Sequence, residues 1–253
     1  MTDAETAEPP PTAPEETQPV EIHKPKPVHN WRELLTELGV VVLGICIAIS
    51  LEQFVEYLHW RGEVRIGRQA LVEEITGVDK FYARRVLIAP CLDRRLDEDA
   101  AGIRDLAANR KIAPRAIVPG ETSPGALLGD AEWQSERSSQ TLTHFPRAEL
   151  ALMSSFYAQT TDMREWLFEE ERSLAALAVM ADDPDHLGPA DLAQLRVNLN
   201  TARMLNFLIT RNARLELGIS TQLGIHYPRS RADFALPIKI WCKPGETLGK
   251  LPD

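Results

Sequence analysis

The chain has 253 residues, of which 44% are hydrophobic and 26% charged, so it is long enough for one domain of ordinary size with appendages. A formal net charge of −9 and an aromatic content of 6% argue against nucleic acid as a partner, which would require a concentrated basic surface or stacking side chains. No G-x-S-x-G, H-E-x-x-H or phosphate-binding glycine loop occurs, and His144 has no nucleophile or acid at motif spacing. We therefore expect no enzymatic activity, no metal and no cofactor.

Residues 1–29 contain seven prolines, six acidic residues and two lysines. Few apolar side chains are available in this stretch to offset the entropy of ordering the backbone. The composition predicts a disordered, polar N-terminal tail.

An apolar segment follows in residues 30–60. Its charge-free run, Leu38–Leu51, would span only about 21 Å as a helix, short of the roughly 30 Å core of a bilayer. Apolar residues on both sides of the run lengthen it, and Trp31 and Trp60 bracket it about 43 Å apart, close to the separation of the two interfacial regions. We predict a transmembrane anchor helix with these tryptophans at the interfaces. Gly44 and Ala48, four residues apart, would allow two such helices to pack closely.

Two other interpretations of this segment are a buried core helix and a cleavable signal peptide. The short positive region that opens a signal peptide is replaced here by the acidic, proline-rich tail. Three basic residues stand on each side of the run, so the positive-inside rule does not decide the orientation. We favour the tail in the cytoplasm and the domain outside, because two cysteines could then pair.

Helical periodicity continues through residues 61–230. The first helix is expected to run to about Ile88, where Pro90 ends it. A second helix of about 18 residues would then include Leu92 and Leu106. Prolines and glycines predict a loop over residues 110–130, and a short helix is expected around Trp133.

Two longer helices are predicted to form an antiparallel hairpin. Pro146 suits the first turn of one, and Pro189 opens the other. The first carries apolar residues at helical spacing: Leu152, Phe156, Met163, Leu167, Leu174 and Leu177. The second does so at Leu192, Leu195, Leu199, Leu205, Leu208, Leu215, Ile219 and Leu223. Three asparagines on the second helix, if partly buried, would specify helix register: Asn198, Asn206 and Asn212. The predicted fold class is all-α, a transmembrane helix continuing into an antiparallel helical bundle, with residues 231–253 irregular.

The chain has three cysteines and no C-x-x-C pair, so the spacing of a zinc site is absent. Cys46 lies in the apolar run, whereas Cys91 and Cys242 lie outside it. In an exported domain Cys91 and Cys242 would be expected to pair, and in the cytosol they would be two unrelated small hydrophobic residues.

Several short motifs resemble an uncharacterised proteobacterial family that has one predicted membrane helix and a cysteine-containing helical domain. They are Asn30-Trp31-Arg32-Glu33, Glu52-Gln53, Trp60-Arg61, the stretch Pro90-Cys91-Leu92-Asp93-Arg94-Arg95-Leu96, and Trp241-Cys242. The resemblance implies a membrane anchor and a Cys91–Cys242 bridge, and it implies no activity.

These observations predict a non-enzymatic, single-pass inner membrane protein with a periplasmic helical domain. Its expected partners are the lipid bilayer and either another envelope protein or a second copy of itself. The alternative is a ligand-sensing periplasmic helical bundle, which is disfavoured because a second membrane helix and an output domain are not found. A pocket in the bundle with converging polar groups would favour the alternative.

Overall fold

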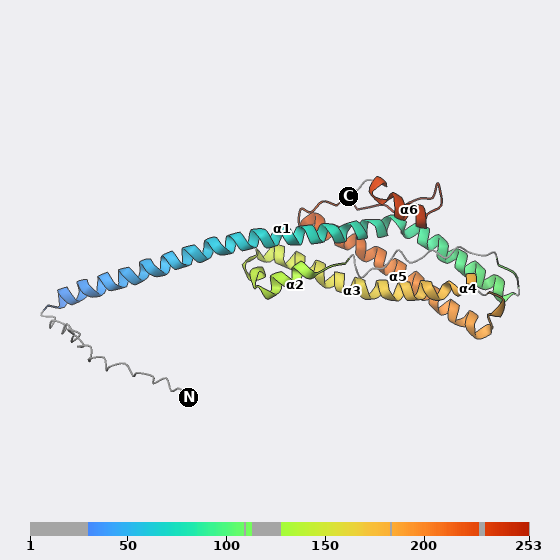
Figure 1. Cartoon of the computed structure of the whole chain (residues 1–253), viewed down its shortest axis with the longest axis horizontal. Coiled ribbons are helices and arrows are strands. Elements are labelled where there is room, and N and C mark those ends of the chain that lie inside the picture. Colours follow the sequence, from blue (N-terminus) through green and yellow to red (C-terminus); the bar gives the residue numbers. More distant parts are fainter. Residues whose placement is uncertain (1–29, 109, 113–127, 183, 228–230, 253) are drawn as a thin grey trace, which may run out of the picture. The chain divides into compact units, whose positions relative to one another are not determined.

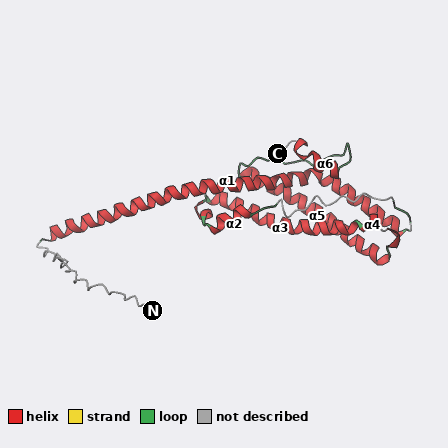
Figure 2. Cartoon of the chain, viewed as in Figure 1, coloured by secondary structure: helices red, strands yellow, loops and turns green. Residues whose placement is uncertain are grey.

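The computed structural model describes residues 30–108, 110–112, 128–182, 184–227 and 231–252 (Figure 1). Its helices are α1 (Trp31–Ala107), α2 (Ala131–Ser138), α3 (Arg147–Leu177), α4 (Val179–Asp182), α5 (Pro189–Gln222) and α6 (Ala235–Trp241). Single 3-10 turns are η2 (Thr141–His144), η3 (Pro184–His186) and η4 (Arg231–Phe234). Most of the described residues are helical, the rest lie in turns and irregular segments, and no strand occurs among them (Figure 2). The all-α prediction is confirmed.

The chain divides into two compact units, residues 1–55 and 56–253. Within the first unit the structure describes residues 30–55, which belong to α1 from Trp31 onward. The predicted disordered tail lies outside the described residues. The second unit is a helical bundle.

A long helical hairpin forms one side of the bundle. α3 has 31 residues and α5 has 34, and the two pack against each other, as the periodicity predicts. Pro146 is the residue that precedes α3. At the start of α5 the Gly188 N–H donates to the Asp191 carboxylate at 2.8 Å, and Pro189 occupies the first turn, where its missing N–H costs nothing. Gly188 and Pro189 thus mark the point where α5 begins.

The direction of α1 relative to the hairpin follows from its hydrogen bonds. In the hydrogen bonds between α1 and α3, the residue numbers increase along both helices: Arg68–Glu149, Tyr82–Thr160 and Arg85–Glu170. In the hydrogen bonds between α1 and α5, the residue numbers increase along α1 and decrease along α5: Asp79–Ser220, Asp93–Asn206 and Asp97–Arg203. α1 and α3 are therefore parallel, so the chain between them, which includes α2, returns along the bundle before α3 begins. The short helix predicted around Trp133 is α2, whereas most of the loop predicted over 110–130 lies outside the described residues.

Pro90 does not end the first helix, contrary to the prediction, and α1 continues to Ala107. Proline removes the hydrogen bond to the carbonyl four residues earlier, that of Val86. The C-terminal segment lies at this point: the Gly249 N–H donates to the Leu87 carbonyl at 2.9 Å. A Cβ atom on Gly249 would lie 1.9 Å from the Val86 oxygen, so a glycine is needed for this approach. This hydrogen bond goes to Leu87 and does not replace the one that Val86 loses to the proline, so packing has to offset that loss.

Two apolar clusters lie on either side of Pro90. The first joins the middle of α1 to α2, α3 and α5, with Tyr82 and Phe156 fully buried at its centre. The second joins the end of α1 to the far end of the hairpin and includes Leu92 and Trp241. Because α1 is buried both before and after Pro90 in this way, leaving the helix at Pro90 would expose apolar surface, which opposes the local preference for a break.

Candidate functional site

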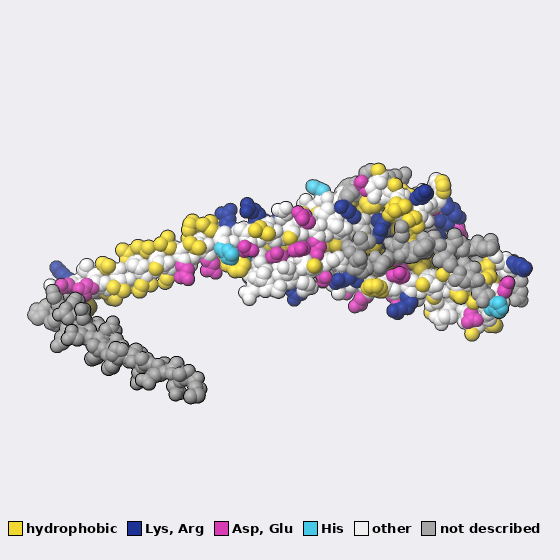
Figure 3. All heavy atoms as spheres, in the orientation of Figure 1, with side chains coloured by type: hydrophobic (Ala, Val, Ile, Leu, Met, Phe, Trp, Pro, Cys, Tyr) yellow, Lys and Arg dark blue, Asp and Glu magenta, His cyan; other side chains and the backbone are white. Residues whose placement is uncertain are grey.

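The N-terminal part of α1 exposes its apolar side chains around the whole helix. From Trp31 to Val55 the large hydrophobic residues are 48% to 66% exposed, and none is buried. This helix is long and apolar enough to cross a membrane. Figure 3 shows the hydrophobic side chains gathered along it. Its apolar window is 0% buried, whereas the core helix of a soluble protein is mostly buried.

The residues predicted for the membrane segment are placed as follows. Trp31 is exposed, and Gly44 has no other atom within 4 Å of the position of a Cβ, so its side of the helix is open. Trp60 belongs to the bundle unit, where its ring stacks on His144 with the ring centroids 3.9 Å apart. The roles of Trp31 and Trp60 at the interfaces, and of Gly44 and Ala48 in packing, stay predictions.

A disulfide joins Cys91 of α1 to Cys242 directly after α6, with the Cα atoms 5.1 Å apart. This is the bridge that the resemblance implies. Glu246 lies beside it and pairs with Arg94 of α1. The sulfur atoms and a Glu246 carboxylate oxygen lie within 4.8 Å of one another, but the bonded sulfurs have no thiolate to offer a metal. The group therefore fastens the C-terminal segment to α1.

A second set of buried polar residues connects three helices. Arg85, Glu170 and Asn206 are each at most 2% exposed. The Arg85 guanidinium donates to Glu170 and, at 2.7 Å, to the Asn206 side-chain oxygen; Asn206 in turn donates to Asp93 at 2.5 Å. Burial raises the pKa of Glu170, and the Arg85 charge opposes that rise. The network thus joins residues of α1, α3 and α5 inside the bundle.

Asp79 of α1 and Glu216 of α5 form a buried acid pair. Both side chains are 0% exposed, and the Asp79 carboxylate accepts a hydrogen bond from Ser220 at 2.9 Å. Its second oxygen and both Glu216 oxygens have no partner among the described residues. Burial raises the pKa of Asp79 to about 7; burial, and then the Asp79 charge, raise that of Glu216 to about 8. At neutral pH the pair therefore retains a proton.

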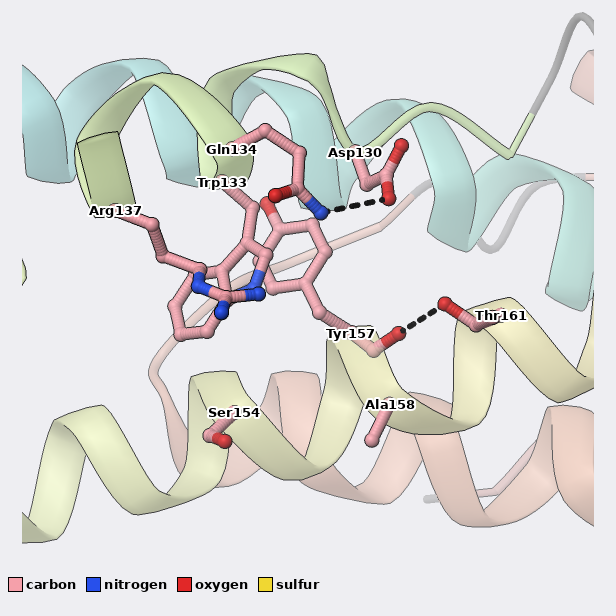
Figure 4. Close-up of a pocket in the computed structure, with 8 residues that line it drawn as sticks. All are labelled: Asp130, Trp133, Gln134, Arg137, Ser154, Tyr157, Ala158 and Thr161. Atoms are coloured by element: carbon pink, nitrogen blue, oxygen red, sulfur yellow. Dashed lines mark hydrogen bonds between the residues drawn. The ribbon is translucent and has the colours of Figure 1, made fainter.

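A shallow cleft of about 370 Å³ lies between α2 and α3 (Figure 4). The rings of Trp133 and Tyr157 stack inside it with centroids 4.7 Å apart. Asp130 at one side accepts two hydrogen bonds from Arg164, at 3.1 and 3.2 Å, which lower the pKa of its carboxyl group. Arg137 offers an exposed cation at the other side.

Contacts with α1 hold the cleft in shape. The Glu74 carboxylate accepts a hydrogen bond from the Tyr157 hydroxyl at 2.7 Å and from the Glu132 and Trp133 N–H groups, which open α2. The lining contains no histidine or cysteine, and its one carboxylate, Asp130, accepts hydrogen bonds from Arg164 and Gln134. The stacked rings and the exposed Arg137 are side chains of the kind that bind a planar or anionic group.

α5 carries exposed apolar residues on the side opposite to its core residues. Val197 and Met204 are each 56% exposed, Phe207 64% and Leu215 50%. Arg211 lies among them, seven residues after Met204 and four before Leu215, and it is also exposed. A spacing of seven residues returns to within about 20° of the same side of a helix. We call these five residues the α5 surface.

The exposed charges that α5 itself carries around the α5 surface are of one sign. Arg196 and Arg214 are exposed and, like Arg211, have no ion-pair partner among the described residues. The only acidic residue of α5 after Asp191 is Glu216, which is buried. In a chain whose acidic residues outnumber its basic ones by 37 to 28, this helix presents a basic and apolar surface.

Over the described residues, fold and site together define an all-α protein with one apolar helix long enough to cross a membrane and a disulfide-bonded helical bundle. No family model matches the chain, and it matches neither a curated protein nor a solved structure. The resemblance to the proteobacterial family therefore identifies no family for this chain.

Sequence reasoning missed the buried charges. Asp79, Arg85, Glu170 and Glu216 fall on the buried side of their helices, at positions where periodicity predicts apolar residues. The signal was present as charged residues within the 3.6-residue apolar pattern. Asn206, predicted to specify register if buried, is 1% exposed and does lie at the centre of the network.

Proposed function

We propose that this protein is a single-pass inner membrane protein whose disulfide-bonded helical domain lies in the periplasm and binds another envelope protein. The observation that carries the proposal is the α5 surface: four large apolar side chains stay exposed on a helix whose other side is packed into the bundle. Exposed apolar residues that line one side of a helix are typical of a protein interface.

Two further observations support the membrane and the compartment. The apolar part of α1 is exposed, and transferring it to lipid would remove that surface from water. The Cys91–Cys242 bridge is favoured in an oxidising compartment such as the periplasm.

Fractionation and protease protection test the anchor and its orientation. We expect the full-length protein to stay with membranes after an alkaline carbonate wash. A protease added to spheroplasts should digest the domain, and inverted membrane vesicles should protect it. Release by carbonate, or digestion only in inverted vesicles, would contradict the membrane anchor or the orientation respectively.

Photo-crosslinking in intact cells tests the binding function. A crosslinking residue is placed at exposed positions along α2, α3 and α5, one at a time. We expect a discrete heterologous adduct from one of these surfaces. If no position gives an adduct, the domain does not function by binding another protein.

A second candidate function, ligand sensing, is supported by the α2–α3 cleft with its stacked rings and exposed Arg137. Binding of small aromatic carboxylates, followed by the fluorescence of Trp133, tests it. Quenching that saturates in the wild type and disappears in Arg137→Gln would favour sensing over protein binding.

A further inference from the structure

We propose that the partner presents an acidic amphipathic helix, and that this helix lies along the α5 surface with a carboxylate facing Arg211. The inference rests on the proposed function and specifies its partner. It stands on three observations: the spacing of the exposed apolar residues, the position of Arg211 among them, and the absence of exposed acidic residues from the described part of α5 after Asp191.

The spacing favours a helix as the partner. Val197, Met204 and Arg211 recur every seven residues, and Leu215 follows four residues later. Spacings of seven and four are those with which side chains of one helix insert between the residues of another. The stretch from Val197 to Leu215 is about 27 Å long, which is five helical turns of contact. Phe207, Met204 and Arg211 are also residue types that are enriched in protein interfaces.

The charges favour an acidic partner. Arg211 would be enclosed by apolar residues once the surface is covered, and an enclosed guanidinium requires an opposite charge. Arg196 and Arg214 border the same side of the helix and are unpaired among the described residues. Arg203, the remaining arginine of α5, already pairs with Asp97 of α1 at 2.5 Å. Three arginines are therefore left for carboxylates of the partner.

A second copy of the chain fits this surface less well. Two α5 helices packed through the same surface would bring at least six arginines together, with no exposed acidic residue from either α5 to offset them. The acidic tail of the chain itself stands on the other side of the apolar helix in sequence. A membrane-spanning helix would keep that tail on the opposite side of the bilayer from α5.

An anionic lipid surface also fits less well. A helix that lies on a membrane separates its basic residues from the apolar side that enters the acyl region. Here Arg211 stands on the apolar side itself, between Met204 and Leu215. Inserting this side into lipid would carry an unpaired guanidinium with it.

The test uses the full-length protein in nanodiscs of zwitterionic lipid and two synthetic helical peptides of about 21 residues. Both peptides have the same apolar heptads; one has glutamate and the other glutamine at the flanking positions. We expect the glutamate peptide to bind at least about tenfold more tightly, with an affinity that falls as salt is added. Arg211→Glu and Phe207→Ser should each weaken this binding about tenfold or more. Arg147→Glu, the same charge reversal at an exposed position of α3, is the matched control and should leave binding unchanged.

In cells, the crosslinker at Phe207 should give a heterologous adduct that Arg211→Glu removes and Arg147→Glu retains. Equal binding of the two peptides, or an adduct that persists in Arg211→Glu, would overturn the acidic helix. An adduct formed only from α2 or α3 would also overturn it while leaving the proposed function intact. An adduct between two copies of the protein would show that the α5 surface serves self-association instead. Binding to anionic vesicles alone, lost in Arg211→Glu, would show that it contacts a lipid surface.

Discussion

Glu216→Gln removes an ionisable group from the middle of the bundle and should change how stability depends on pH. The wild-type carboxyl group has a pKa of about 8 in the folded protein against about 4.5 in the unfolded chain. Between these values the folded state binds more protons than the unfolded state, so the free energy of unfolding falls as pH rises. From pH 4.5 to pH 7 this one group lowers it by about 3 kcal/mol, at 1.36 kcal/mol for each pKa unit. Above pH 8 no further loss comes from Glu216.

Glutamine has nearly the same shape and does not ionise, so its variant lacks this loss. Urea unfolding of the full-length protein in detergent, followed by tryptophan fluorescence at several pH values from 5 to 8.5, measures the difference. We expect the stability of Glu216→Gln relative to wild type to increase by roughly 3 kcal/mol as pH rises from 5 to 8. Glu165→Gln removes an exposed carboxylate from α3 and is the matched control, expected to give a curve parallel to the wild type.

The reasoning would be refuted by a Glu216→Gln curve that is parallel to the wild-type curve across this range. That result would mean that Glu216 is charged in the folded protein at pH 5, and hence that it has a cationic or solvated partner. If stability fell more steeply with pH in the variant than in the wild type, the pKa of Glu216 would be lowered by folding instead of raised. Asp79→Asn should show the same behaviour over a window that ends lower, because the pKa of Asp79 is about 7.

Three further predictions concern the joints of the bundle. Cys242→Ser should lower the free energy of unfolding by about 5 kcal/mol, the value that the chain-entropy model gives for a bridge between residues 151 apart. The bridge would be disproved if thiol labelling of the wild type under non-reducing conditions found two reactive thiols outside the membrane segment. Gly249→Ala should cost about 1–3 kcal/mol by thermal unfolding because its Cβ would overlap a backbone carbonyl, whereas Gly218→Ala, with open space on α5, should be neutral or slightly stabilising. Glu170→Ala should lower the free energy of unfolding by about 3–5 kcal/mol because it leaves Arg85 buried without its carboxylate. In a double-mutant cycle with Arg85→Met, the double variant should lose less stability than the two single variants together. Additive losses would show that the pair is not coupled.

The sequence by itself determined the elements whose signal is repeated over many residues. The charge-free run Leu38–Leu51 predicted the exposed apolar helix, and two sets of regularly spaced leucines predicted α3 and α5 with the turn near Pro189. Each is supported by many positions that agree, so no single contact elsewhere in the chain can reverse it. Asn206 was recognisable for a related reason: an amide within an apolar pattern requires a partner.

Only the tertiary structure decided the features that depend on residues distant in sequence. Pro90 locally favours a helix end, but α1 is buried on both sides of it and stays continuous. The parallel course of α1 and α3 depends on how the chain returns between them, and the apolar periodicity of the sequence does not predict that path. The stacking of Trp60 on His144 and the pairing of Arg85 with Glu170 likewise join residues more than 80 positions apart. Local sequence sets which side of a helix is apolar, whereas the energy of a buried charge is set by the partner that folding brings to it.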